Sequence, residues 1–123
     1  MTQRVATCSC GQLRASCEGD PVRVSICHCL ACQKRTGSAY GAQARWPRDK
    51  VTIDGRTSEY VRVADSAKRI TFHFCPKCGT TVYYWINDIP DVVAVAIGAF
   101  ADPAFPPPDF SVDGSRKPPV NDV

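Results

Sequence analysis

Eight cysteines stand at unusually close spacings in this chain of 123 residues. They are grouped as Cys8-Ser9-Cys10, Cys27-His28-Cys29-Leu30-Ala31-Cys32 and Cys75-Pro76-Lys77-Cys78, with Cys17 alone. Spacings of one or two residues are typical of thiolates that converge on one metal ion, whereas disulfides join positions farther apart. The sequence begins without the apolar stretch of a secretory signal, so we expect a cytoplasmic protein, in which disulfides are rare. The cysteines therefore predict metal sites.

Length and composition predict one domain of modest size. Hydrophobic residues make up 44% of the sequence, a share typical of globular rather than disordered chains. The sequence has no run of about 18 apolar residues, so we expect neither a membrane-spanning helix nor a membrane partner. The formal net charge of +3 comes from basic residues scattered among acidic ones, which disfavours a nucleic-acid partner.

Apolar and polar residues alternate along most of residues 1–100, which predicts a mainly β fold. The expected strands are 13–17, 22–26, 40–45, 51–53, 59–63, 69–74, 80–85 and 92–97. The last of them reads Val-Val-Ala-Val-Ala-Ile, which indicates burial on both faces. One short helix is expected over 30–36, ended by Gly37.

The composition changes after residue 101. Six of the ten prolines fall in 103–123, and such a segment cannot form a helix or a central strand. We therefore expect a zinc-binding domain over 1–101 and a Pro-rich extension over 102–123, packed on that domain in extended form. The last four residues, 120–123, are expected to be mobile.

Cys8, Cys10, Cys75 and Cys78 are predicted to form a structural zinc site. Two short pairs supply four thiolates, which is the ligand set of a closed tetrahedral zinc. A glycine follows each pair, so the backbone can turn tightly and point amides at sulfur. The ion would link two segments that lie about 65 residues apart, which helps a chain with a small core. Because four protein ligands leave no open position, we expect no catalysis at this ion.

Cys27, Cys29 and Cys32 are predicted to bind a second zinc. They offer three thiolates within six residues, so a fourth ligand must come from elsewhere. The candidates are an outside molecule, His28, His73 and Cys17. An open fourth position would make this zinc catalytic, whereas a fourth protein ligand would make it structural. A site without metal, with reactive thiols, is the remaining alternative.

The residues proposed as alternative ligands also have simpler interpretations. Cys17 alternates with Leu13 and Ala15, which predicts a small buried side chain rather than a metal ligand. His28 and His73 are expected to orient or cap neighbouring groups.

A polar segment follows Cys32, and Lys34, Arg35 and Thr36 within it are predicted to bind substrate. Two cations beside an open zinc could hold the carboxylate of a small thiol while its sulfur meets the metal. The alternative is a solvated basic helix face, which is the preferred interpretation for Lys34 taken alone.

The motifs together resemble one known family. They read Cys8-x-Cys10-Gly11, Cys27-His28-Cys29-x-x-Cys32-Gln33-Lys34-x-Thr36-Gly37 and Phe74-Cys75-x-x-Cys78-Gly79-Thr80. In order and spacing they resemble the glutathione-dependent formaldehyde-activating enzymes, a family that also includes centromere protein V. The likeness spans roughly residues 5–100, and its combined spacing is far more specific than one C-x-x-C motif.

The resemblance implies a β-tent fold, in which small antiparallel sheets are organised around zinc. It implies two zinc ions per chain, one structural and one catalytic, held by the four-cysteine and three-cysteine sets respectively. The family's activity is the addition of glutathione to formaldehyde, formally a carbon–sulfur lyase reaction run in reverse. In the C-terminal segment Ser115-Arg116-Lys117-Pro118 keeps a Ser-Arg-x-Pro frame, but Pro119 replaces the family's tryptophan.

Two functions remain open from the sequence. The first is a zinc-dependent carbon–sulfur lyase-type enzyme acting on adducts of glutathione or a similar small thiol. The second is a non-catalytic, zinc-stabilised module that binds protein or nucleic acid. The three-cysteine motif with its neighbouring cations favours the enzyme.

Overall fold

Ten strands, one α-helix and two short 3-10 helices make up the described part of this computed structural model, residues 2–64 and 66–112. Their bounds are β1 Gln3–Thr7, β2 Arg14–Glu18, β3 Arg23–Cys27, α1 Leu30–Thr36, β4 Gly41–Pro47, η1 Arg48–Lys50, β5 Val51–Asp54, β6 Ser58–Val63, β7 Arg69–Phe74, β8 Thr81–Ile86, β9 Val92–Ala96, η2 Ile97–Phe100 and β10 Phe110–Val112.

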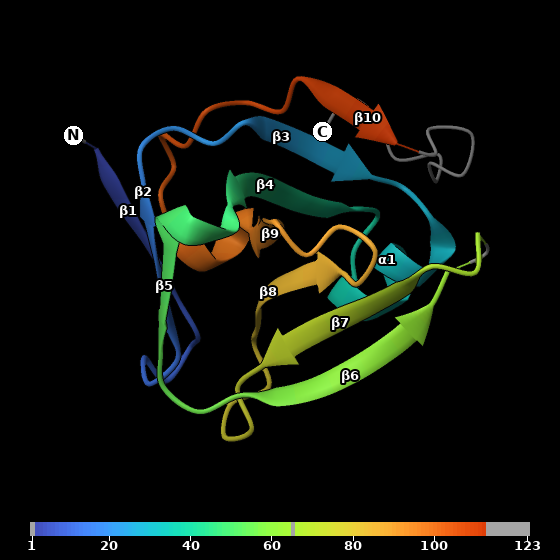
Figure 1. Ribbon diagram of the computed structural model, residues 1–123, viewed down its shortest axis with the longest axis horizontal. Coiled ribbons are helices and arrows are strands. Elements are labelled where there is room, and N and C mark those ends of the chain that lie inside the picture. Colours follow the sequence, from blue (N-terminus) through green and yellow to red (C-terminus); the bar gives the residue numbers. More distant parts are fainter. Residues whose placement is uncertain (1, 65, 113–123) are drawn as a thin grey trace.

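The strands form two sheets. One has three strands in the order β1-β2-β5, and the other has seven in the order β10-β3-β4-β9-β8-β7-β6. In Figure 1 the larger sheet curves from β10 and β3 at the top to β7 and β6 at the bottom, with the smaller sheet on the left and α1 on the right. The pairs are antiparallel except for β10 and β3, which run parallel.

The core lies between the two sheets. Leu13 from the loop before β2 and Trp46, Val82 and Val95 from the larger sheet are its largest fully buried side chains. Trp46 also donates its indole N–H to the carbonyl of Gly19, at 3.1 Å, so its polar atom is satisfied. This packing covers one face of the larger sheet, and the opposite face does not take part in it.

The opposite face of the larger sheet carries a separate, smaller cluster. Because side chains alternate along a strand, Ala44 of β4 faces the core while Gln43 and Arg45 face the other way. Phe72 and Tyr84 pack there with their rings 4.9 Å apart between centroids. Strand β9 is buried on both faces, as its unbroken apolar sequence predicts.

Helix α1 begins and ends at residues that its sequence identifies. The Sγ of Cys29 accepts a hydrogen bond from the Cys32 N–H, at 3.3 Å, and caps the first turn. Gly37 ends the helix in the left-handed conformation, with φ +68°. The expected helix over 30–36 is therefore confirmed.

The mainly β fold class and the eight expected strands are confirmed, with every strand end within two residues of the expected position. Strand β1 was not expected, because Gln3–Thr7 shows no clear alternation. Strand β10 was not expected either, because it has three residues and follows a run of prolines. It joins the sheet at its edge, where hydrogen bonds connect Asp109 N–H to the Val24 carbonyl and His28 N–H to the Val112 carbonyl, at 2.9 and 2.8 Å.

The division into a domain over 1–101 and an extension over 102–123 stays a prediction. Residues 113–123, with the expected mobile end and the Ser-Arg-x-Pro frame, lie outside the described residues. Within the part of the chain that the structure describes, no helix has the length and apolar character needed to cross a membrane.

Candidate metal centres

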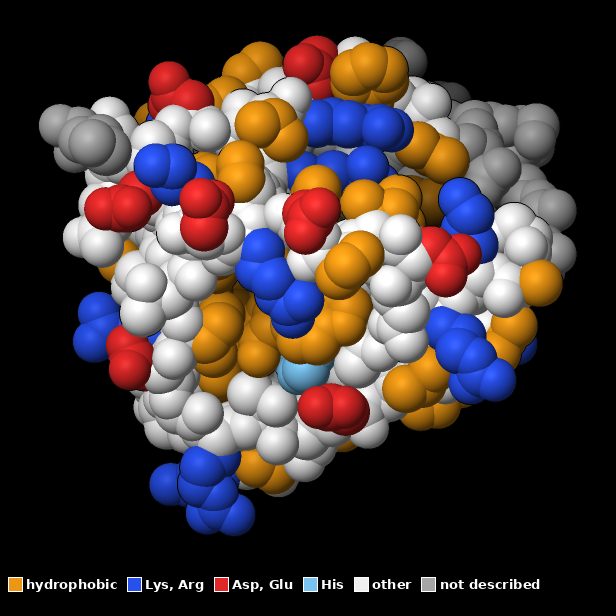
Figure 2. Space-filling model, viewed as in Figure 1, with side chains coloured by type: hydrophobic (Ala, Val, Ile, Leu, Met, Phe, Trp, Pro, Cys, Tyr) orange, Lys and Arg blue, Asp and Glu red, His pale blue; other side chains and the backbone are white. Residues whose placement is uncertain are grey.

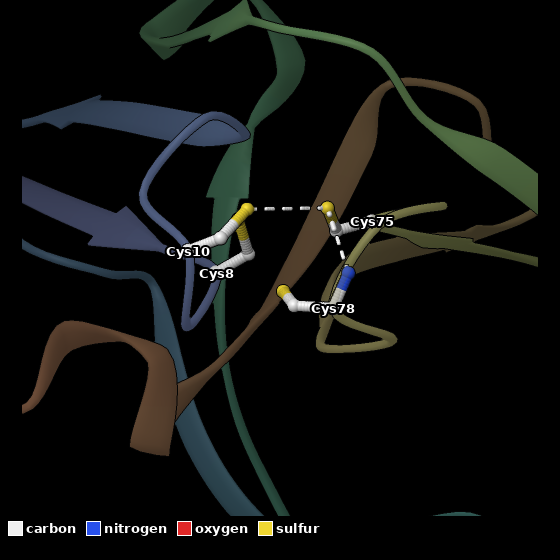
Figure 3. A group of neighbouring side chains, drawn as sticks. All are labelled: Cys8, Cys10, Cys75 and Cys78. Atoms are coloured by element: carbon white, nitrogen blue, oxygen red, sulfur yellow. Dashed lines mark hydrogen bonds between the residues drawn. The ribbon is translucent and has the colours of Figure 1, made fainter.

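The first cysteine cluster joins two loops that are distant in the sequence. Cys8 and Cys10 lie in the turn between β1 and β2, and Cys75 and Cys78 lie in the turn between β7 and β8. Figure 3 shows the four side chains converging from these loops, with their sulfur atoms pointing toward one another. All four Sγ atoms lie within 4.8 Å of one another.

The sulfur spacing of this four-cysteine cluster fits a tetrahedral ion. Zinc–sulfur bonds of about 2.3 Å place tetrahedral sulfurs about 3.8 Å apart. The Sγ atoms of Cys8 and Cys10 are 3.5 Å apart, and those of Cys10 and Cys75 are 3.7 Å apart. A set of four thiols at these spacings is the donor set of structural zinc, so the residues fit the ion that the sequence predicts.

Hydrogen bonds point at these sulfur atoms, as thiolate ligands require. The N–H of Leu13 donates to the Cys8 Sγ and that of Lys77 to the Cys75 Sγ, each at 3.3 Å. The Gln12 amide donates to the Cys75 Sγ at 3.0 Å and to the carbonyl of Arg56 at 2.9 Å. Gln12 therefore ties the cluster to the loop before β6, a role that sequence reasoning missed.

These contacts alter the acidity of the thiols. Hydrogen bonds with Thr80, chiefly from its hydroxyl 3.3 Å from the sulfur, lower the pKa of Cys78 to about 5. Burial opposes ionisation of Cys75, but the bond from Gln12 and two backbone N–H groups outweigh it and lower the Cys75 pKa. Both sulfurs are thus prepared for the thiolate form, which binds metal.

The second cluster lies at the junction of β3 and α1. Cys27 ends β3, Cys29 caps the helix, and Cys32 faces inward from its first turn. The three Sγ atoms lie within 4.8 Å of one another. Cys32 is buried, whereas Cys27 and Cys29 are half-buried. The strand-to-helix turn therefore brings together all three thiols that the spacing predicts.

The three-cysteine cluster differs from the first in its ligand count. Among residues 2–64 and 66–112, no fourth His, Cys, Asp or Glu joins the group. Cys17 lies in the core between the sheets, with none of its surface exposed. His73 belongs to an aromatic cluster, stacked on Tyr83 with 4.4 Å between ring centroids, and His28 packs edge-on against Tyr40. None of the three proposed protein ligands completes the group.

Burial and mutual repulsion act on the three thiols. Burial, with the negative charge of Cys32, raises the pKa of Cys27 to about 12, and burial also raises the pKa of Cys32. Burial opposes ionisation of Cys29 too, but the hydrogen bond from the Cys32 N–H and the charge of Arg62 lower its pKa. Three close thiolates need a compensating cation, and a bound divalent metal ion is such a charge.

A cleft of about 690 Å³ opens beside this cluster. All three cysteines line it, together with the Phe72 and Tyr84 rings from the free face of the larger sheet. Figure 2 shows basic side chains among hydrophobic ones over β3 and β4, on the face seen in that view. No Asp or Glu lines the cleft among the residues that the structure describes. The cleft is therefore apolar at its floor and positive at its walls.

Arg35 packs beside the three-cysteine cluster and does not line the cleft. Its guanidinium packs over the rings of Phe72 and Tyr84, at 4.9 and 5.4 Å from their centroids. One terminal nitrogen lies 4.0 Å from the Cys32 Sγ. Gly41 leaves the room for this arrangement, because a Cβ there would lie 2.9 Å from the same guanidinium and 3.6 Å from that sulfur.

The other two predicted substrate residues lie elsewhere. The Lys34 side chain is exposed on α1 and does not line the cleft. The Thr36 hydroxyl donates to the carbonyls of Cys32 and Tyr40, at 2.8 and 3.1 Å, and so serves the end of the helix. Substrate contact by Lys34, Arg35 and Thr36 stays a prediction.

Sequence reasoning missed the charged and polar residues that do line the cleft. Arg45 of β4, Arg62 of β6 and Gln43 of β4 all face it. They lie on strands far apart in the sequence, and their alternation marks only which face they occupy. The order of the strands and the curvature of the sheet bring them together, and neither can be read from these residues.

The comparison with known proteins agrees with these motifs and this geometry. A family model described as glutathione-dependent formaldehyde-activating enzyme matches residues 3–112. The chain belongs to this family. The glutathione-dependent formaldehyde-activating enzyme match includes both cysteine clusters and every described strand.

The fold of this family member also has a counterpart among solved structures. A crystal structure of a Rhodobacter sphaeroides protein, determined as a structural genomics target, matches with a TM-score of 0.61 and 17% sequence identity. The match covers 84% of this chain and 91% of that chain. At this identity the likeness supports the fold alone, and it agrees with the β architecture expected of the glutathione-dependent formaldehyde-activating enzyme family.

Proposed function

We propose that this protein is a zinc-dependent enzyme of the carbon–sulfur lyase type, which acts on adducts of glutathione or a similar small thiol with formaldehyde. The observation that carries the proposal is the difference between the two clusters. Four cysteines form one closed set, whereas the other set has three cysteines, no fourth protein ligand among the described residues, and a cleft beside it. Three protein ligands beside an accessible cleft are the arrangement of catalytic zinc.

The addition mainly requires that the thiol and the aldehyde are held close together in the right orientation. A carbon–sulfur bond forms between the thiol and the aldehyde carbon, and the thiol proton ends on the former carbonyl oxygen, so no other reactant is consumed. Zinc held by Cys27, Cys29 and Cys32 would supply an electrophilic position for the substrate sulfur or oxygen. The cleft would hold the two reactants together, which alone accelerates a bimolecular addition.

The chain's own groups support this role. Arg35, 4.0 Å from the Cys32 Sγ, offsets part of the negative charge of the cysteine cluster. Tyr84 lines the cleft, and burial raises the pKa of its hydroxyl, so it stays protonated at neutral pH and offers an O–H donor. Phe72 and Tyr84 exclude water from the floor of the cleft, which strengthens the electrostatic contacts within it.

Exchange NMR at equilibrium tests the proposal. Glutathione and ¹³C-formaldehyde are mixed with the zinc-loaded protein, and the interconversion of free and adduct forms is measured above the spontaneous rate. We expect the wild type to accelerate exchange, and Cys32→Ser to return it to the spontaneous rate while the zinc content falls from two ions per chain to one. Cys17→Ser is the matched control, because Cys17 is in neither cluster.

Each outcome decides between the two functions. Acceleration that is lost in Cys32→Ser and kept in Cys17→Ser supports the enzyme. Exchange at the spontaneous rate with the fully zinc-loaded wild type rejects catalysis of this reaction and favours the zinc-stabilised binding module. A second zinc as resistant to mild chelation as the first would contradict an open site.

A further inference from the structure

The larger sheet presents one row of cross-strand neighbours to the cleft. Arg45 pairs with Ala94, Ala94 with Tyr84, and Tyr84 with Phe72, across β4, β9, β8 and β7. The row therefore begins with a guanidinium and continues over a small residue to two aromatic rings. Phe72 and Tyr84 line the floor of the cleft described above. Ala94 packs against them in the same cluster.

A second guanidinium stands at the far end of this floor. Arg62 on β6 lies beside Ile70 of β7, and its guanidinium is 5.6 Å from the centroid of the Phe72 ring. Four strand spacings separate β4 from β6, which is about 19 Å along the sheet surface. Although their strands are this far apart in the sheet, Arg45 and Arg62 line one cleft together with the three cysteines.

Neither guanidinium forms a salt bridge with a carboxylate in the described chain. Among residues 2–64 and 66–112 the structure has one salt bridge, between Arg4 and Asp20. Arg45 and Arg62 are both half-buried, and none of the described residues that line the cleft with them is a carboxylate. Partly buried, unpaired cations that face one cavity are poised to bind anions.

Gln43 adds an independent sign of a missing ligand. It is 4% exposed, lies two residues before Arg45 on β4, and lines the same cleft. Its amide nitrogen donates to the Ser25 hydroxyl at 2.8 Å, but its Oε1 atom is buried with no hydrogen-bond partner in the described structure. A buried acceptor without a partner is costly unless a water molecule or a ligand supplies a donor.

We propose that Arg45 and Arg62 bind the two terminal carboxylates of a peptide-like thiol laid across this floor, and that Gln43 accepts a hydrogen bond from its amino group beside Arg45. This inference rests on the proposed function, because it identifies the class of thiol as a dicarboxylate with an amine at one end. For glutathione, the γ-glutamyl end, which carries both an amine and a carboxylate, would lie at Arg45. The glycine carboxylate would lie at Arg62, with the cysteine sulfur between them.

The test measures binding of S-methylglutathione to the zinc-loaded chain by titration calorimetry. This thioether keeps both carboxylates but has no thiol, so it cannot react, and the result is independent of turnover. Loss of one charge-assisted contact weakens binding by roughly tenfold to a hundredfold. We expect a weakening of that size in Arg45→Gln and in Arg62→Gln, with zinc content unchanged. Arg69→Gln is the matched control, because Arg69 is exposed on β7 and does not line the cleft.

A second ligand fixes the orientation. S-methylglutathione esterified at its glycine carboxylate should bind more weakly than the parent to the wild type and to Arg45→Gln. It should bind as tightly as the parent to Arg62→Gln, which has already lost that contact.

The proposal is overturned if both arginine variants bind S-methylglutathione as tightly as Arg69→Gln does, or if the wild type does not bind it. If instead the ester binds as tightly as the parent to Arg45→Gln and more weakly to Arg62→Gln, the glycine carboxylate lies at Arg45 and the assigned orientation of the ligand is wrong. Exchange NMR on the same samples separates the two proposals, because turnover by a wild type that does not bind S-methylglutathione rejects only the carboxylate contacts. Intact binding without turnover rejects only the enzyme.

Discussion

At the scale of single residues, the two cysteine clusters differ most in what surrounds their sulfur atoms. The four-cysteine cluster is held by hydrogen bonds from Gln12, Leu13 and Lys77 in the adjoining loops. The three-cysteine cluster has a guanidinium beside it, because Arg35 fills the space that Gly41 leaves. Small changes next to these residues should therefore affect one cluster without the other.

Gly41→Ala should weaken metal binding at the three-cysteine cluster and leave the fold intact. The new Cβ would lie 2.9 Å from the end of the flexible Arg35 side chain, which can move away, and 3.6 Å from the Cys32 Sγ. We expect zinc to leave this cluster at a lower chelator concentration, with unchanged circular dichroism. Gly98→Ala is the control, because nothing lies within 4 Å of a Cβ added there. Equal chelator sensitivity in both variants would contradict this role of Gly41.

Cys17 should be unreactive in the folded protein. Its side chain is fully buried, and burial raises its pKa to about 12. At pH 8 the thiolate fraction is then about one in ten thousand, and the thiolate is the form that reacts. Peptide mapping after iodoacetamide treatment should find Cys17 unlabelled in the native protein and labelled after unfolding. Labelling of the native protein at the rate of a free thiol would show that this core position opens readily.

At the scale of elements, the connections between strands determine where the functional residues lie. The turn after β1, the turn after β7 and the loop before β6 meet at one corner, where Gln12 bonds both the Cys75 Sγ and the backbone of Arg56. At the other end of the molecule, β10 pairs with β3 and ends beside Cys27. The four-cysteine cluster thus joins segments that are remote in the sequence, and the three-cysteine cluster lies beside one.

Gly55→Ala should destabilise the protein through the connection between β5 and β6. Gly55 has φ +103°, and a Cβ there would lie 2.1 Å from the backbone oxygen of Gln12. Neither the strain nor the backbone contact can be relieved by a side-chain movement, so we expect a loss of more than about 1 kcal/mol. Urea unfolding measures this loss against Gly98→Ala. A midpoint equal to that of the control would mean that the loop can shift away from Gln12.

At the scale of the whole molecule, the four-cysteine cluster joins the two sheets. Cys8 and Cys10 belong to the hairpin of the smaller sheet, and Cys75 and Cys78 belong to the hairpin of the larger one. A metal ion there would close a long loop of the chain, and the binding free energy of a structural metal is part of the folding free energy. The three-cysteine cluster, in contrast, uses residues of one short segment.

Cys75→Ser should therefore abolish folding, whereas Cys32→Ser should keep the fold and lose one zinc. Strong chelation of the wild type should unfold the chain only when the second of two zinc ions is removed. Circular dichroism recorded together with zinc release measures both effects. A folded, cooperative Cys75→Ser protein without zinc at this cluster would show that the core alone stabilises the fold.

Much of the fold could be predicted from local patterns. Alternation marked eight strands because side chains on a half-buried strand must alternate, and Gly37 marked the end of α1 because it adopts a left-handed conformation. Strand β10 was not predicted, because three residues are too few to show an alternating pattern and its partner, β3, lies more than 80 residues earlier in the sequence. The pairing, not the sequence of Phe110–Val112, makes it a strand.

Close spacing alone indicates which thiols gather, because cysteines a few residues apart cannot lie far from one another. It also determined that two such pairs could form a closed set of four. That the set of three borders a cleft, and that Gln43, Arg45 and Arg62 face it, could be seen only in the folded chain. The physical reason is that a strand's sequence specifies which face a side chain takes, while sheet order and curvature specify what lies opposite. Each short group of cysteines is a local property of this chain, whereas the joining of the two pairs and the proposed substrate contacts are properties of the folded sheets.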